Sequence, residues 1–399
     1  MLGQLTYLAV AAVLAPVVGE LLRRLAIPSV VIEILIGVAI GPELLDLVRP
    51  TGFILSLSNV GLAMLMFLAG FELDLRLIRG RPLRLAGASW GLSVACGAAI
   101  ALAAFGIADW HAGVAIGLAL TTTALGTLLP IVRDSGLLNR EVGRHVLSVG
   151  SLGEFGPIVL IALVLDQTQP LLSVVLLVSF GLLAAIVALA ASRPWGSAVT
   201  AALRRGLHSS SQLPVRISML VIVALVLLAS RLGLDVLLGS FAAGIIIRIA
   251  VTARGDTEST HDFRDKIEAI GFGLFVPVFF IVSGAKLNLS AFGRHPWALL
   301  TIPVVLAALL VVRGGTTLVT YRRALAYRDR LALAVFSATG LPLIVVITTI
   351  AVNDHHLTGQ TAAAMVTAGM LSVLIFPVLA LRLIGVERRD HPAFDNDAL

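Results

Sequence analysis

Three ionisable side chains of this sequence lie within long apolar runs, where a charge is costly. Glu33 lies in the run 28–42, Glu154 in SVGSLGEFGPIVLIALV, and Arg313 in VVLAALLVVRGGTTLV. Acids and bases inside membrane spans are rare, and they commonly mark ion or proton pathways. Glu154 and Arg313, deep in separate spans, therefore predict an ion pair or a shared site. Two plainer interpretations remain open: a purely structural salt bridge, since desolvation offsets much of its attraction, and a structural hydrogen bond of Glu33 near a helix end.

Hydroxyl, glycine and proline residues interrupt two of the apolar runs. They are Thr121, Thr122, Thr123, Gly126 and Pro130 in the first run, and Ser337, Thr339, Gly340 and Pro342 in the second. Proline removes a backbone donor and glycine loosens a helix. Each interruption alone is typical of an ordinary kink. Two interruptions in corresponding spans, with an acid and a base in the adjacent spans, indicate a transporter site built from broken helices.

The composition excludes an ordinary soluble protein. The 399 residues are 58% hydrophobic and 13% charged, with a mean hydropathy of +1.01, whereas soluble domains carry about 25% charge. The apolar runs are continuous rather than alternating, which favours membrane-spanning helices over a barrel. We therefore predict an all-α polytopic membrane protein of about thirteen transmembrane helices. The expected ranges are 4–22, 28–42, 57–73, 85–106, 111–132, 143–165, 170–192, 215–231, 235–252, 267–285, 296–318, 330–352 and 359–384.

Basic residues between the spans set the expected orientation. Loops after odd-numbered spans carry most of the arginines. Loops after even-numbered spans hold only Arg49, Arg231, Lys286 and Arg294. Because basic loops stay in the cytoplasm, we expect the N-terminus outside and the C-terminus inside. The same distribution explains the net charge of +6 without a nucleic-acid partner.

The order of the spans predicts an inverted repeat. The fourth to sixth expected spans are a helix, an interrupted helix and the helix with Glu154. The eleventh to thirteenth are the helix with Arg313, an interrupted helix and a helix. The odd offset between these triplets turns one upside down relative to the other, as inverted repeats require. The basic segment 193–214 is interpreted as a linker between halves, with room for a short amphipathic surface helix.

Five sequence blocks occur in an order and spacing typical of one family of transporters. They are IPSVVIEILIGVAIGP at 27–42, MLMFLAGFELDL at 64–75, ALTTTALGTLLPIVRDSGLLN at 119–139, LLGSFAAGIII at 237–247 and FVPVFFIVSGAKLNL at 275–289. Together they resemble the membrane part of the bacterial monovalent cation:proton antiporter superfamily, in the branch of Kef-type potassium systems and NapA-type sodium/proton exchangers. The resemblance covers nearly the whole chain.

The resemblance implies a fold of the NhaA/NapA type in the bacterial inner membrane, and a homodimer. The transmembrane domain is expected at 1–386 and a short cytoplasmic tail at 387–399. A core is expected at about 85–165 and 296–384, with a scaffold and dimer part at about 1–80 and 170–290. In the family, the sixth span carries Asp, Asn or Gln followed by Asp, and this pair falls on Gly153 and Glu154. The family's basic residue, often Lys, falls on Arg313, and the acid of its second broken helix is replaced by Leu341.

Glu154 is the expected shared carrier in an exchange of Na⁺ or K⁺ for H⁺, because one carboxylate holds a proton or a small cation but not both. Thr122, Thr123 and Ser151 are the expected oxygen ligands. The expected supporting positions are Arg313, Thr121, Thr339, Gly340, Glu33 and Glu72. Because an arginine keeps its proton, a single carboxylate predicts electroneutral exchange. No cofactor and no enzymatic activity are expected.

Two alternatives to a self-sufficient antiporter remain. The first is a Kef-like efflux system gated by a separate soluble partner. The second is a non-transporting relative that acts as a sensor or scaffold, favoured by the missing acids at Gly153 and Leu341. A metabolic membrane enzyme is disfavoured, because no His/Cys/Asp cluster in the sequence has the spacing of metal ligands; His355 and His356 follow Asp354 in an expected outer loop, where a solvated cluster is the default.

Overall fold

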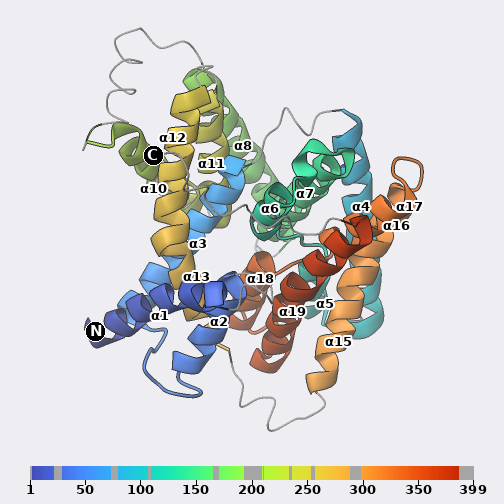
Figure 1. The fold of residues 1–399 in the computed structure, drawn as a ribbon, viewed down its shortest axis with the longest axis horizontal. Coiled ribbons are helices and arrows are strands. Elements are labelled where there is room, and N and C mark those ends of the chain that lie inside the picture. Colours follow the sequence, from blue (N-terminus) through green and yellow to red (C-terminus); the bar gives the residue numbers. More distant parts are fainter. Residues whose placement is uncertain are drawn as a thin grey trace, which may run out of the picture.

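A computed structural model describes residues 2–21, 29–72, 80–106, 109–164, 170–192, 209, 211–232, 236–252, 257–287 and 298–385. The regular structure in these ranges is helical throughout (Figure 1). The linker helix expected within 193–214 falls mostly outside the described residues, as does the tail 387–399. The all-α prediction is therefore confirmed for the part of the chain that the structure describes.

The helices occupy the ranges that hydropathy predicts. They are α1 (Leu2–Leu21), α2 (Ser29–Ile40), α3 (Gly52–Glu72), α4 (Arg81–Phe105), α5 (Trp110–Leu120), α6 (Leu125–Asp134), the short 3₁₀ helix η2 (Leu137–Asn139), α7 (Glu141–Val164), α8 (Pro170–Ser192), α10 (Leu213–Arg231), α11 (Val236–Thr252), α12 (Thr257–Ile270), η3 (Gly271–Phe275), α13 (Val276–Ala285), α15 (Ala298–Leu309), η4 (Leu310–Gly315), α16 (Thr316–Thr320), α17 (Tyr327–Ser337), α18 (Pro342–Asn353) and α19 (Gly359–Ile384). Among the described residues, nine helical stretches are long and apolar enough to cross a membrane, and two of them contain a short break. Each expected range is filled by one helix or by consecutive helices.

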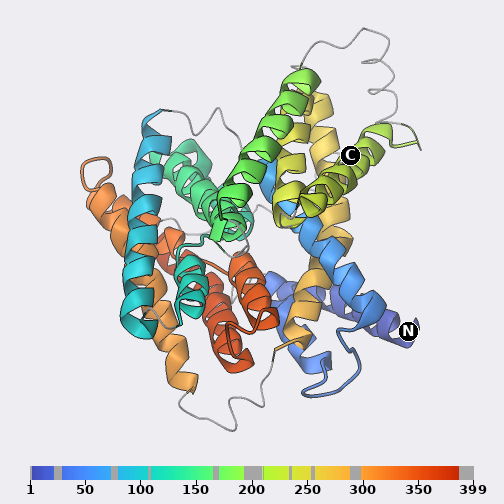
Figure 2. The same cartoon turned by 180° about the vertical axis from the view of Figure 1, so that it is seen from behind.

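The helices form two groups that lie side by side (Figures 1 and 2). One group contains α4 to α7 and α15 to α19, in which α4 packs on α5, α7 and α16, and α19 packs on α15, α17 and α18. The other contains α1 to α3 and α10 to α13, and α8 joins the two through contacts with α7 and α11. The first group contains the residues of the expected core and the second those of the expected scaffold, and we call these two groups the core and the scaffold.

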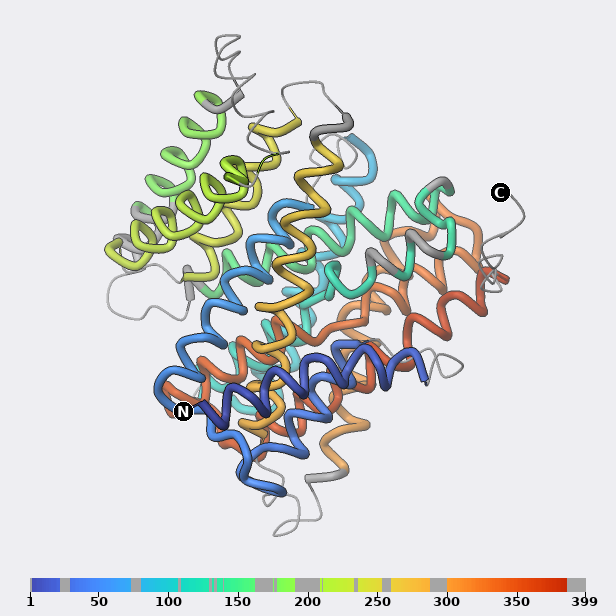
Figure 3. The backbone as a smooth tube through the Cα atoms, turned by 60° about the vertical axis from the view of Figure 1, so that its left-hand side comes forward, coloured from blue at the N-terminus to red at the C-terminus, as the bar shows by residue number. Residues whose placement is uncertain are grey.

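Glycines allow the scaffold helices to pack with their backbones almost in contact. A Cβ added at Gly70 would lie 2.1 Å from the carbonyl oxygen of Phe241, and one at Gly244 would lie 2.1 Å from that of Phe67. These glycines therefore hold α3 against α11, as small residues do in membrane helix packing. Figure 3 shows α3 running alongside the continuous rod of α12, η3 and α13, which it also contacts.

Both interrupted helices are broken where the sequence predicts. The first break separates α5 from α6 at residues 121–124, and the second separates α17 from α18 at residues 338–341. Gly126 and Pro130, expected near the first break, lie within α6 instead. Helix α5 packs on α18, and the backbone N–H of Ala124 in the first break donates to the carbonyl of Thr339 in the second at 2.7 Å, so the two broken helices cross at their breaks.

Two spans contain a short π-helical stretch that the sequence does not predict. One is η3, between α12 and α13, and the other is η4, which carries Arg313 between α15 and α16. Such stretches insert an extra residue into a turn and are frequent at functional sites. The second stretch therefore draws attention to the side chains around Arg313.

Candidate functional site

The unwound residues of the first break find hydrogen-bond partners in two other spans. The backbone N–H of Thr123 donates to the carbonyl of Gly153 at 2.9 Å, and that of Ala124 donates to the carbonyl of Thr339 at 2.7 Å. Backbone groups away from water must be satisfied inside the protein. The break is thus tied both to α7 and to the second break.

The second break is stabilised by a serine of α19. The Gly340 N–H donates to Ser372 Oγ at 3.1 Å, and Ser372 Oγ lies at the same distance from the Gly340 carbonyl. A Cβ at Gly369 would lie 2.9 Å from that carbonyl oxygen. Glycine at 369 therefore lets α19 approach closely enough for Ser372 to reach the unwound backbone.

Arg313 is a fully buried hub between these elements. Its Nε and Nη2 donate to Thr123 Oγ1 at 2.9 and 2.7 Å, and Nη2 also donates to the carbonyl of Val149 at 3.1 Å. Thr123 Oγ1 in turn donates to the carbonyl of Ser337 at 2.6 Å. The guanidinium thus links η4 and α7 to the first break, and Thr123 extends the link to the end of α17.

Further hydroxyl groups lie around this hub, and sequence reasoning missed all of them but Ser337. Ser93 Oγ lies 2.8 Å from Thr316 Oγ1 and 3.4 Å from Arg313 Nη1. Ser89 Oγ lies 3.1 Å from Thr317 Oγ1, which reaches Ser337 Oγ at 3.1 Å. The available signal was the spacing of Ser89 and Ser93, which places both on one face of an apolar helix.

Gly153 is required by the position of Arg313. A Cβ at residue 153 would lie 2.5 Å from Arg313 Nη2 and 2.5 Å from Thr123 Oγ1. The guanidinium and the hydroxyl therefore fill the space that a side chain at 153 would occupy. This explains in physical terms why the chain has glycine where the resembling family has a polar side chain.

Glu154 faces the start of α6. Its side chain is buried, and the backbone N–H groups of Leu125 and Gly126 hydrogen-bond to its carboxyl group. The first N–H groups of a helix have no partner within the helix and form its positive end, which favours a negative charge. The break therefore places a half-helix end, rather than a basic side chain, against the buried carboxylate.

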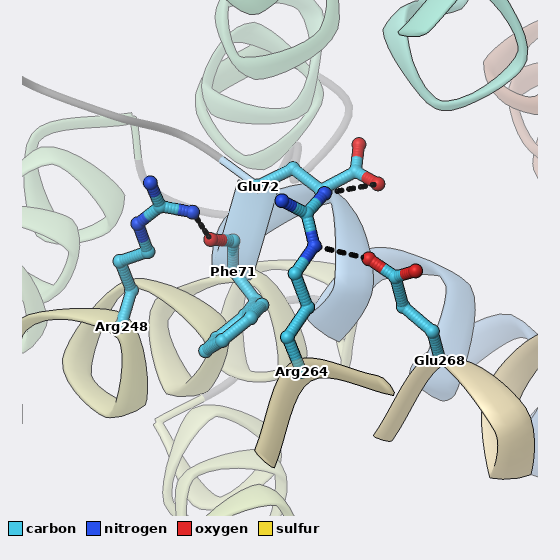
Figure 4. Close-up of polar contacts among 5 residues, drawn as sticks. All are labelled: Phe71, Glu72, Arg248, Arg264 and Glu268. Carbon is cyan, nitrogen blue, oxygen red and sulfur yellow. Dashed lines mark hydrogen bonds and ion pairs between the residues drawn. The ribbon is translucent and has the colours of Figure 1, made fainter. Parts of the chain in front are cut away.

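A second acid from the scaffold lies close to Glu154. Glu72, the last residue of α3, is near enough for its charge to act on Glu154. Figure 4 shows that Glu72 also belongs to a charged cluster with α12: Arg264 Nη2 lies 3.9 Å from Glu72 Oε1, and Arg264 Nε pairs with Glu268. Beside them, Arg248 Nη1 donates to the Phe71 carbonyl at 2.9 Å and satisfies the end of α3.

The predicted pair of Glu154 and Arg313 does not form an ion pair in the structure. Each binds a different part of the first break: Arg313 binds the Thr123 hydroxyl, and Glu154 takes the amides of Leu125 and Gly126. The two side chains thus share a segment of backbone instead of a salt bridge.

The other predicted site residues divide into those at the break and one away from it. Thr121 and Thr122 are buried at the break and donate to carbonyls of α5 at 2.8 Å. Ser151 donates to the Leu147 carbonyl at 2.7 Å. Thr123 does not fit its expected role as a cation ligand. Its hydroxyl donates to the Ser337 carbonyl and accepts two hydrogen bonds from the Arg313 guanidinium, so its oxygen has no lone pair left for a cation.

Thr339 and Gly340 lie in the second break, as expected, and a Cβ at Gly340 would lie 2.9 Å from Thr122 Oγ1. Glu33 lies elsewhere, buried in α2, which packs mainly on α1 and α13. Its Oε2 has no hydrogen-bond partner among the described residues. The structure therefore does not bring Glu33 to the crossing.

Comparison with known proteins decides the family. The family described as "Sodium/hydrogen exchanger, transmembrane" matches residues 9–381. The chain belongs to this exchanger family. The resemblance seen in the sequence blocks is thereby confirmed.

Exchanger relatives of several kinds are similar to this chain. The Na⁺/H⁺-K⁺ antiporter GerN of Bacillus cereus is 28% identical over 299 residues, which is 72% of each chain. The glutathione-regulated potassium-efflux system protein KefC of an Enterobacter species is 28% identical over 96% of this chain and 60% of its own length. The sodium proton antiporter MjNhaP1 of Methanocaldococcus jannaschii matches in structure with a TM-score of 0.66, at 17% identity, over 96% of this chain and 99% of that one. This last likeness confirms the predicted exchanger fold.

Proposed function

We propose that this chain is a secondary antiporter that exchanges Na⁺ or K⁺ for H⁺. The observation that carries the proposal is the buried Glu154 carboxyl, held at the start of a half-helix inside the crossing of two broken helices. A carboxyl group in this position holds either a proton or a small cation. The names of the related antiporters support the same substrates.

Glu154 is the shared carrier in this mechanism, with Glu72 facing it from the scaffold. A cation bound by Glu154 is further stabilised by the negative charge of Glu72. The hydroxyls of Thr122 and Ser151 donate to the carbonyls of Ala119 and Leu147, so their oxygen lone pairs are available to bind a cation. Hydroxyl, carboxylate and carbonyl oxygens suit a hard monovalent cation.

Arg313 holds the break in place and takes no part in proton transfer. Its guanidinium is satisfied by Thr123, Val149 and Ser93, and an arginine keeps its proton at physiological pH. A single exchanging carboxyl then gives one cation per proton, so the exchange is electroneutral.

Transport proceeds by motion of the core against the scaffold. The core is residues of about 85–165 and 296–384, and it carries Glu154 past the scaffold helix that carries Glu72. We further propose that the protein lies in the bacterial inner membrane with its N-terminus outside and its C-terminus in the cytoplasm, as the arginine distribution supports. A homodimer through the scaffold completes the proposed assembly.

A second candidate is favoured by the likeness to KefC, which spans nearly the whole of this chain. In that case a separate regulatory subunit gates efflux of the cation. Such a protein moves the cation without counter-movement of protons.

The test is flux in proteoliposomes with a trapped pH dye and an imposed pH gradient. Na⁺, K⁺ and Li⁺ are added in turn to the wild type, to Glu154→Gln and to Glu154→Asp. We expect cation-dependent loss of the gradient in the wild type, none in Glu154→Gln, and partial activity in Glu154→Asp. Glu141→Gln is the matched control, because Glu141 lies on the same helix with an exposed side chain.

Two results would count against this assignment. Exchange that persists in Glu154→Gln excludes Glu154 as the carrier. Cation flux without proton movement favours the partner-gated alternative.

A further inference from the structure

A cleft of about 420 Å³ lies between the scaffold and the core, away from the acids. Its scaffold wall includes Asn59 of α3 with Ser283 and Lys286 at the end of α13, and its core wall includes Thr348, Thr349 and Asn353 of α18. Asn59, Lys286 and Asn353 are exposed, so the cleft opens to solvent at this end of the helices. By the arginine distribution this is the outer face.

The inner end of the cleft points toward the crossing of the broken helices. Val345 of α18 lines the cleft, and it lies four residues beyond Leu341 at the second break. At the helical rise per residue this is about 6 Å along the axis. The cleft therefore extends from the solvent-exposed end of α18 to within about 6 Å, along the helix axis, of the second break.

Most polar groups in the cleft suit a cation, and one does not. The hydroxyls of Ser283, Thr348 and Thr349 each donate to a carbonyl of their own helix at 2.7 Å, so they present lone pairs to the cleft. Lys286 is the charged side chain among the described residues that line it. Lys286 therefore places a positive charge in a cleft whose other polar groups suit a cation.

We propose that Lys286 is a specificity-determining residue that discriminates against divalent cations at the outer entrance. Repulsion grows with the charge of the ion. At a separation of about 8 Å with the dielectric response of water, Coulomb's law lowers occupancy about two-fold for a monovalent cation and about six-fold for a divalent one. The charge of Lys286 thus lowers the occupancy of the cleft slightly for the transported monovalent ion and more strongly for a divalent competitor. This inference rests on the proposed antiport.

The experiment measures exchange in right-side-out and everted membrane vesicles, with Na⁺ and Ca²⁺ added to one face only. In Lys286→Gln we expect the half-saturating outer Na⁺ to fall about two-fold, and the outer Ca²⁺ that half-inhibits exchange to fall about six-fold. Lys286→Glu moves both further in the same direction. High salt shrinks the differences by screening. Values for the inner face stay as in the wild type.

Two controls separate the charge of Lys286 from other effects. Lys286→Arg keeps the charge and is expected to keep the wild-type ratio of the two constants. Arg231→Gln removes a positive charge at the end of α10, outside the cleft lining, and is expected to leave the ratio unchanged. An unchanged ratio in Lys286→Gln, or an equal change at both faces, overturns the role of Lys286. Exchange by the wild type in the same vesicles tests the antiport separately, so the two failures are distinguishable.

Discussion

A methyl group added at Gly153 tests whether the space around Arg313 is as tightly filled as the structure indicates. The new Cβ of Gly153→Ala would lie 2.5 Å from Arg313 Nη2 and 2.7 Å from Thr123 Cβ. The guanidinium or the threonine must then move, although each is held by the other. The substitution should therefore loosen the contact between α7, η4 and the first break.

The size of the effect follows from three contributions. Loss of one hydrogen bond to a charged group costs about 1.5–3 kcal/mol, and overpacking costs about 1–3 kcal/mol. Replacing glycine by alanine in a helix returns up to about 1 kcal/mol. We expect the free energy of unfolding to fall by about 3 kcal/mol from these contributions together.

Gly126→Ala is the matched control. Gly126 lies in a neighbouring helix end beside Glu154, and a Cβ there would meet nothing within 4 Å. It should therefore keep or slightly raise stability through helix propensity alone. The assay is thermal unfolding of both variants in the same detergent, where a loss of about 3 kcal/mol lowers the midpoint of a chain of this length by roughly 4 °C. Equal midpoints for the two variants would refute the assigned position of the guanidinium.

Two further predictions concern scaffold packing and a loop ion pair. Gly244→Ala places a Cβ 2.1 Å from the Phe67 carbonyl oxygen. Because a backbone carbonyl moves less easily than a side chain, we expect the free energy of unfolding to fall by at least about 3 kcal/mol. The control is Gly181→Ala, where a Cβ would have nothing within 4 Å, and it should leave the midpoint of thermal unfolding unchanged. The Arg49 guanidinium beside Asp46 holds the pKa of that carboxyl below its usual range, so the pair stabilises the fold above the ordinary aspartate pKa of about 4 and loses that effect as pH falls through the lowered value. Unfolding midpoints of the wild type and Asp46→Asn should accordingly converge at acid pH, and a constant difference across pH would contradict this account.

The helices and their breaks could be predicted from local sequence alone. Lipid leaves an apolar run of sufficient length one stable form, because each backbone group must be satisfied within the segment. The ranges of α8 and α19, for example, match the prediction at both ends. The threonine run at 121–123 and Gly340–Leu341–Pro342 likewise mark breaks by local chemistry, since hydroxyls and proline compete with helical hydrogen bonding.

Partners across the fold could not be predicted in the same way. The sequence suggested that Arg313 meets Glu154, because opposite charges in lipid attract. The structure instead satisfies Arg313 with Thr123 and the Val149 carbonyl. It gives Glu154 two amides at the end of α6. The N–H groups at a helix end and a backbone carbonyl carry partial charges, which the residue types in a sequence do not reveal.

What the sequence by itself determined about this protein is its membrane class, its broken helices and its exchanger family. What only the tertiary structure decided is which groups come near one another: Glu72 of α3 lies near enough for its charge to act on Glu154 of α7, and Arg313 fills the space left by Gly153. The reason is physical. Helix formation in lipid depends on neighbours within a few residues, whereas a site depends on contacts between spans far apart in the chain, whose rotation and depth are set by packing.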